Sequence, residues 1–105
     1  MSPSEPIASQ KTDVMASSLA SDRNYRSRWA TALAFVLRKE REERELSQWE
    51  MSQRAGLHPT YISRLENGRL GISIPTLALC AEALGLSVAE IVSRAEAMIT
   101  TEQQA

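Results

Sequence analysis

Residues 46–69 read LSQWEMSQRAGLHPTYISRLENGR. Ser47 is followed three residues later by Glu50, a spacing that lets the serine cap a helix while the glutamate bonds back to the serine's own N–H. This capping box predicts a short helix over 47–55. Gly56 then supplies a residue that tolerates positive φ, as a sharp turn between two helices requires.

The second half of this stretch predicts another short helix. Pro59 suits the first turn of a helix, where its missing N–H costs nothing. Asn67 and Gly68 end the helix, which gives it the bounds 58–66. Two short helices joined by an Ala-Gly-Leu turn at 55–57 are typical of a helix-turn-helix.

Three further helices are predicted around this pair. A first helix over 26–44 combines an apolar stripe with a run of charged, helix-favouring residues. The stripe consists of Trp29, Leu33, Val36 and Leu37. Ser73 and Gly85 bound a fourth helix, and Ser87 with Glu90 repeats the capping box at the start of a fifth. No stretch alternates with period two, so the predicted fold class is all-α with five helices.

Composition divides the chain into three parts. Residues 1–22 are rich in Ser, Ala and Pro and lack an apolar period, which predicts a disordered N-terminal tail. Residues 23–100 form the predicted domain, and 101–105 are expected to be a flexible C-terminus. The chain carries a net charge of −1, yet its segment 23–73 has ten basic and six acidic residues, a charge of +4. A basic segment between acidic ones is the asymmetry that a polyanion-binding face needs.

Composition also excludes several classes of protein. The chain has one cysteine, Cys80, and one histidine, His58, so we expect neither an internal disulfide nor a zinc cluster. Cys80 lies on an apolar stripe and is predicted to be buried. No apolar run approaches the ~20 residues of a membrane span, and the N-terminus lacks a secretory signal pattern. We therefore expect a soluble, cytoplasmic protein with no cofactor, metal, membrane contact or enzymatic activity.

The 58–66 helix has a face suited to nucleic acid. Ile62 and Leu65 are predicted to point inward. The residues left on the outer surface are His58, Pro59, Thr60, Tyr61, Ser63 and Arg64. Because this helix has no acidic residue before Glu66, its outer face can enter a DNA major groove without repelling phosphates.

From Leu33 to Ile91 the chain resembles the XRE-type (Cro/C1-type phage repressor) helix-turn-helix domain. The resemblance rests on Leu-Ser-Gln at 46–48, Ala-Gly-Leu at 55–57 and Tyr-Ile-Ser-Arg-Leu-Glu-Asn-Gly at 61–68. It implies a five-helix lambda-repressor-like fold and sequence-specific binding to double-stranded DNA. Glu45 stands where relatives often have glycine, so we expect a differently shaped turn before the 47–55 helix.

The resemblance also implies roles for individual residues. Pro59, Thr60 and Arg64 occupy the positions that read base edges, Pro59 through apolar contact with a thymine methyl group. The positions that contact the sugar–phosphate backbone hold Ser47, Gln48, Tyr61, Asn67 and Arg69. Arg41 and Glu66 match an ion pair that joins the first helix to the end of the base-reading helix. Without the resemblance, Arg64 and Arg69 would be interpreted as solvated side chains and Tyr61 as a partly buried one.

One recognition helix reads too few base pairs to be selective, so we expect a homodimer on a palindromic operator. Its two recognition helices would lie about one DNA turn, ~34 Å, apart. The last predicted helix carries a long apolar stripe of Val88, Ile91, Val92, Ala95, Met98 and Ile99. We expect Val88 and Ile91 to point inward, and Val92, Ala95 and Ile99 to contribute to the dimer interface. The alternative is that the whole stripe covers the core of one chain.

These observations favour a small bacterial or phage transcriptional regulator, a repressor controlled by its own concentration as restriction–modification controller proteins are. One alternative is the antitoxin of a toxin–antitoxin pair. Another is a protein-interaction adaptor that has lost DNA binding, although the basic segment 23–73 argues against it. Besides DNA, the candidate partners are a toxin and RNA polymerase. Trp49 is expected at the surface, near the DNA backbone or such a partner.

Overall fold

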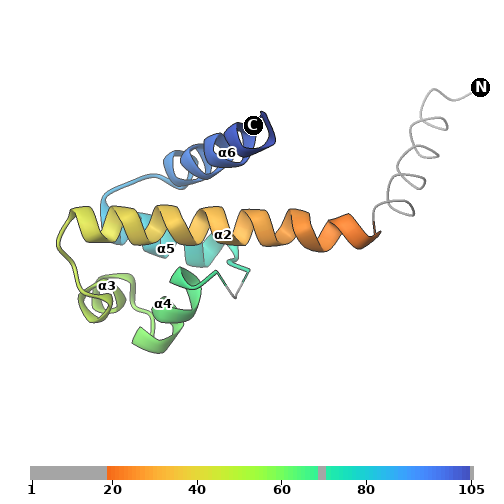
Figure 1. The fold of residues 1–105 in the computed structure, drawn as a ribbon. Helices are drawn as coiled ribbons and strands as arrows, with labels where there is room; N and C mark the ends of the chain where they lie inside the picture. The colour runs from red at the N-terminus through yellow and green to blue at the C-terminus, as the bar shows by residue number, and fades with distance from the viewer. Residues whose placement is uncertain (1–18, 69–70, 105) are drawn as a thin grey trace, which may run out of the picture.

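The computed structural model describes residues 19–68 and 71–104. This part of the chain contains helices and no strand, which confirms the all-α prediction. Its helices are α2 (Leu19–Glu43), α3 (Gln48–Ala55), α4 (Pro59–Glu66), α5 (Ile74–Leu84) and α6 (Val88–Gln104) (Figure 1).

The long helix α2 is the axis of the fold. Helix α6 packs along one side of it, while α3 and α4 lie on the other side, at the end where α2 leads into α3 (Figure 1). Helix α5 contacts α2, α3 and α6 and so connects the two sides. The predicted helix-turn-helix pair, α3 and α4, therefore packs on a frame made of α2, α5 and α6.

The predicted caps set the helix boundaries. Ser47 Oγ accepts the Glu50 N–H at 3.0 Å, and the Glu50 carboxylate accepts the Ser47 N–H at 3.0 Å. The same reciprocal pair forms between Ser87 and Glu90 at the start of α6. Helices α3 and α5 are each followed by a left-handed glycine. Because each cap satisfies amides or carbonyls left free at a helix end, the short helices can begin and end where the sequence predicts.

Two helices extend past the predicted limits. Helix α2 begins at Leu19 rather than near residue 26, and α6 continues to Gln104 rather than ending near residue 100. The sequence offers a reason, since no glycine or proline occurs between Pro6 and Gly56 or after Gly85. Residues 19–22 are therefore helical and not part of a disordered tail, and residues 1–18 lie outside the described residues.

The core lies between α2, α5 and α6 and reaches down to α3 and α4. Its buried apolar residues include Val36, Leu37, Leu46, Met51, Ile62, Leu65, Leu77, Cys80, Leu84 and Ile91. Cys80 is buried as predicted, and this burial raises the pKa of its thiol to about 11. No single helix in the described ranges is long and apolar enough to cross a membrane; α5 and α6 reach that length only as a pair bent by 102°.

The apolar stripe of α6 corrects one prediction. Ala95 and Ile99, assigned above to a dimer interface, are buried within the single chain, and Ile91 is fully buried beside them. Helix α2 packs along α6 and buries this stripe within one chain. The prediction was therefore wrong for Ala95 and Ile99. Val92 is only half-buried, and its place in an interface stays a prediction.

Candidate nucleic-acid interface

Helix α4 presents the face that the sequence predicts. Ile62 and Leu65 are buried against the core, while Thr60 and Arg64, one turn apart, are exposed. Pro59 is half-buried at the first position of the helix. His58 precedes it as the N-cap, and its Nδ1 accepts the Thr60 N–H at 3.1 Å. The predicted base-reading residues thus lie together at and beyond the start of a capped helix.

Helix α3 is held against the core by its inward-facing residues. Met51, Ser52 and Ala55 are buried, and the Ser52 hydroxyl donates to the Trp49 carbonyl oxygen at 2.6 Å. The turn into α4 passes through Gly56 with φ of 70°, and an added Cβ there would meet nothing within 4 Å. The left-handed backbone, and not a lack of space, is therefore what calls for glycine at this turn.

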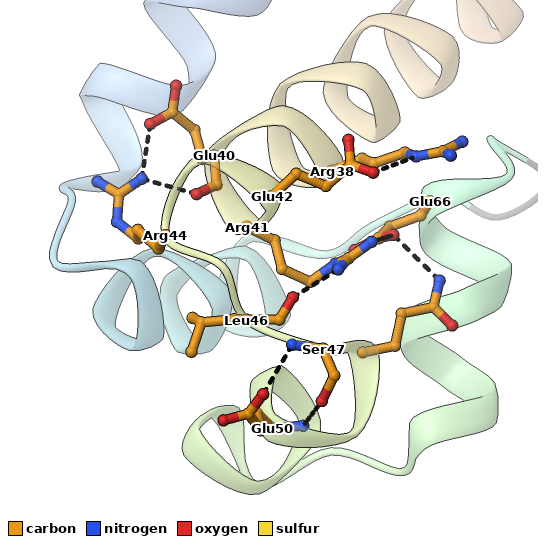
Figure 2. A network of polar contacts seen from close by, with 10 residues as sticks. Arg38, Glu40, Arg41, Glu42, Arg44, Leu46, Ser47, Glu50 and Glu66 are labelled. Atoms are coloured by element: carbon orange, nitrogen blue, oxygen red, sulfur yellow. Dashed lines mark hydrogen bonds and ion pairs between the residues drawn. The ribbon is translucent and has the colours of Figure 1, made fainter.

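The predicted ion pair between Arg41 and Glu66 is present and is bidentate. Arg41 Nε lies 2.7 Å from Glu66 Oε2, and Arg41 Nη2 lies 2.9 Å from Oε1 (Figure 2). The third guanidinium nitrogen donates to the Leu46 carbonyl oxygen at 2.6 Å. Only 11% of the Arg41 side chain and 5% of the Glu66 side chain are exposed. The hydrogen bond to Glu66 raises the pKa of Arg41 above its usual value, so the guanidinium stays charged.

Glu66 also reaches α3, a contact that sequence reasoning missed. Gln48 Nε2 donates to Glu66 Oε1 at 3.1 Å, from the first position of α3. One carboxylate therefore accepts N–H groups from α2 and α3 while it sits at the last position of α4. The spacing of Gln48 and Glu66 in the sequence gave no signal for this contact, because it depends on how α3 and α4 cross.

The residues predicted to contact the DNA backbone surround the recognition face. Ser47 and Asn67 are exposed, and Gln48 and Tyr61 are half-buried. The Ser47 hydroxyl accepts the capping bond, so its own proton is available to a phosphate oxygen. Arg69 lies outside the described residues. The structure thus gathers four of the five predicted positions around α4, at the start of α3 and at the end of α4.

The turn that leads into α3 contains the unusual residue noted in the sequence. Glu45 has φ of 55°, in the region that glycine adopts most easily. Its N–H donates to the Glu42 carbonyl oxygen at 2.9 Å, and the Leu46 N–H donates to the Arg41 carbonyl oxygen at 3.2 Å. Glu45 therefore takes the backbone conformation of a glycine at a cost in conformational energy.

Four large apolar side chains in the described residues are exposed: Phe35, Trp49, Ile74 and Leu79. Trp49 is 61% exposed on α3, as predicted for a surface residue, and Phe35 on α2 and Ile74 on α5 are also exposed. Trp29, by contrast, packs against the core. The two tryptophans therefore lie in different surroundings.

Known proteins share this arrangement. The helix-turn-helix family HTH_3, of the XRE type, matches residues 37–91, just over half of the chain. A segment of 63 residues is 38% identical to the immunity repressor protein of Bacillus phage phi105, covering 60% of this chain and 43% of the phage protein. The chain thus corresponds to less than half the length of that relative.

Solved structures agree with the family match. The clp gene regulator ClgR from Corynebacterium glutamicum aligns with a TM-score of 0.68 and 30% identity, over 72% of this chain and 81% of that one. The restriction–modification controller protein C.Esp1396I, solved as a tetramer in complex with its natural 35 base-pair operator, gives a TM-score of 0.58 and 26% identity, over 64% and 92%. The chain belongs to the HTH_3 family of XRE-type helix-turn-helix proteins.

Proposed function

We propose that this chain is a sequence-specific DNA-binding transcriptional regulator that reads the major groove with α4. The observation that carries the proposal is the outer face of α4, where exposed Thr60 and Arg64 stand without a neighbouring acid. The one carboxylate on this helix, Glu66, is neutralised by Arg41. A face that carries an arginine and no unpaired carboxylate attracts DNA phosphates, and its side-chain donors remain free to bond to base edges.

Base readout is assigned to three residues. Arg64 is long enough to donate two hydrogen bonds to a guanine, and Thr60 offers a hydroxyl and a methyl group. Pro59 can contact only through its ring, which suits a thymine methyl group. Backbone contacts are assigned to Ser47, Gln48, Tyr61, Asn67 and Arg69.

We further propose that the chain acts as a dimeric repressor on a palindromic operator. The controller protein C.Esp1396I was solved as a tetramer on its operator, and a phage immunity repressor is a relative. Val92 on α6 is half-exposed and is the remaining candidate for the predicted interface. Sedimentation over a range of concentrations tests this assembly: a Val92→Arg variant should be monomeric, and a wild-type mass that stays monomeric at all concentrations would contradict it.

The DNA-binding proposal is tested by titrating the protein with the DNA upstream of its own gene and with random duplex, at several salt concentrations. Wild type should prefer the upstream DNA, and Arg64→Ala should lose ~1–3 kcal/mol of that preference. Arg54→Ala is the charge-matched control, because Arg54 is an exposed arginine in the last turn of α3 to which no DNA contact is assigned. If Arg64→Ala keeps the wild-type preference, base reading by Arg64 is contradicted, and if wild type itself binds neither DNA, the adaptor interpretation gains over the regulator. An additional protein partner, a toxin or RNA polymerase, stays a prediction.

A further inference from the structure

An open hollow of about 200 Å³ lies between α2 and the turn that follows α4. The residues that line it include Thr31, Phe35, Arg38, Glu66, Asn67 and Gly68. Its two walls come from the middle of α2 and from the end of the proposed recognition helix. The hollow is therefore continuous with the surface assigned above to DNA, although the sequence analysis gave none of its α2 residues a role in DNA binding.

The position of the turn against α2 is fixed by a close approach. Gly68 has φ of 69°, and a Cβ added there would lie 3.5 Å from the Thr31 Cα. The turn thus rests almost directly on the α2 backbone. This contact holds Asn67 and Arg38 at opposite walls of the same hollow.

Two glutamates lie near the hollow, and each is paired with an arginine. Glu66 lines it, but its oxygens already accept N–H groups from Arg41 and Gln48, and its side chain is 5% exposed. Glu42 faces Arg38 at 3.5 Å, with 58% of the Arg38 side chain and 55% of the Glu42 side chain exposed (Figure 2). An ion pair this exposed contributes little and exchanges readily for a stronger anion.

We infer that Arg38 binds a phosphate of the DNA backbone, next to the phosphate assigned to Asn67. The guanidinium would leave Glu42 and donate to the phosphate oxygens, which carry a full charge and accept two parallel N–H bonds. This contact extends the DNA surface from the end of α4 onto the side of α2. The inference rests on the proposed function and names a phosphate contact beyond it.

The neighbouring pair on α2 provides a matched control. Lys39 lies 4.0 Å from Glu43 with the same i,i+4 spacing, and the two side chains have the same exposed fractions, 58% and 55%. Lys39, however, lines a different hollow of about 230 Å³ that faces α6, together with Arg94 and Met98. The Arg38 and Lys39 pairs therefore match in spacing and exposure and differ mainly in which side of α2 they occupy.

The test compares Arg38→Gln with Lys39→Gln in titrations of random duplex over a series of salt concentrations, with thermal unfolding to confirm that both fold. Each substitution removes one positive charge, so long-range attraction to DNA falls equally in both. Arg38→Gln should also reduce the slope of log affinity against log salt by ~0.9 per bound protomer, whereas Lys39→Gln should keep the wild-type slope. At low salt, Arg38→Gln should bind roughly threefold to tenfold more weakly than Lys39→Gln.

Glu42→Gln gives a second, independent readout. Because it removes the carboxylate that competes with phosphate for Arg38, it should tighten DNA binding, and Glu43→Gln should do so less. Equal slopes for Arg38→Gln and Lys39→Gln would overturn the inference. If Arg64→Ala loses base preference while Arg38→Gln keeps the full slope, only the Arg38 contact fails. If wild type shows no salt-dependent DNA binding, the proposed function fails with it.

Discussion

Two carboxylates tie the sides of this molecule to α2, and they differ in how far their partners are removed from water. Glu66 fastens α4 through Arg41, and both side chains are nearly buried. Glu40 fastens α6 through Arg94 and also accepts Arg44, but 44% of the Arg94 side chain and 33% of the Arg44 side chain are exposed. Similar chemistry therefore forms a nearly buried ion pair at α4 and solvent-exposed ion pairs at α6, where the released partners can be solvated when the carboxylate is lost.

The largest expected effect comes from Glu66→Gln. The substitution keeps the shape of the side chain but leaves the buried Arg41 charge without its partner, so unfolding free energy should fall by about 3 kcal/mol. Urea unfolding followed by tryptophan fluorescence measures this. DNA affinity should fall as well, because Gln48 and the end of α4 lose their common anchor. A loss no larger than that of Glu40→Gln would contradict the difference drawn between the two carboxylates.

Alanine substitutions at two glycines compare the turn between α3 and α4 with the turn between α5 and α6. Gly56 between α3 and α4 and Gly85 between α5 and α6 have φ of 70° and 72°, and neither has a neighbour within 4 Å of an added Cβ. Alanine at either position should cost ~1–2 kcal/mol of stability, as a left-handed non-glycine residue does. When DNA affinity is compared at equal fractions of folded protein, Gly56→Ala should bind DNA more weakly than Gly85→Ala. Equal DNA affinity in the two variants would show that the turn at Gly56 has no special part in recognition.

Glu40→Gln is expected to cost less, about 1 kcal/mol, because solvent can hydrate the released Arg94 and Arg44. Thermal unfolding at low and high salt measures this effect, which should shrink as salt screens the exposed pairs. DNA affinity corrected for folded fraction should match wild type. A marked loss of DNA affinity would mean that α6 influences the recognition surface through α2.

The smallest expected effect is a gain. Glu45→Gly places glycine at φ of 55° and should stabilise the protein by up to ~1 kcal/mol, since it removes the strain of a left-handed glutamate. Glu45→Ala is the control, because alanine removes the same charge but keeps the strain. If both variants shift the unfolding midpoint equally, the charge of Glu45 and not its backbone is responsible.

The parts of the fold that the sequence predicts are those governed by local rules. Ser47, Ser73 and Ser87 cap helices because a cap needs only nearby amides, and Gly56 and Gly85 end helices through their own backbone freedom. The Arg41–Glu66 pair came from the family resemblance, since 25 residues separate the partners and no local rule joins them.

The rest depends on how helices cross. Ala95 and Ile99 belong to an apolar stripe whose sequence is equally consistent with a core and with a dimer interface. Only the packing of α2 against α6 decides between these two alternatives. The Gln48–Glu66 bond and the hollow beside Arg38 arise where α4 meets α2 and α3. Neither the Gln48–Glu66 bond nor the hollow beside Arg38 has a characteristic spacing or composition, so the sequence offers no signal for them.

The most direct test of base reading by α4 is a scan of a bound duplex in which each base pair is changed singly, measured with wild type and Arg64→Ala. Wild type should lose ~1–3 kcal/mol at each critical base pair. Arg64→Ala should become indifferent at one base pair of each half-site and keep the wild-type pattern elsewhere. An unchanged pattern in Arg64→Ala, at full or reduced affinity, would contradict direct base reading by this residue.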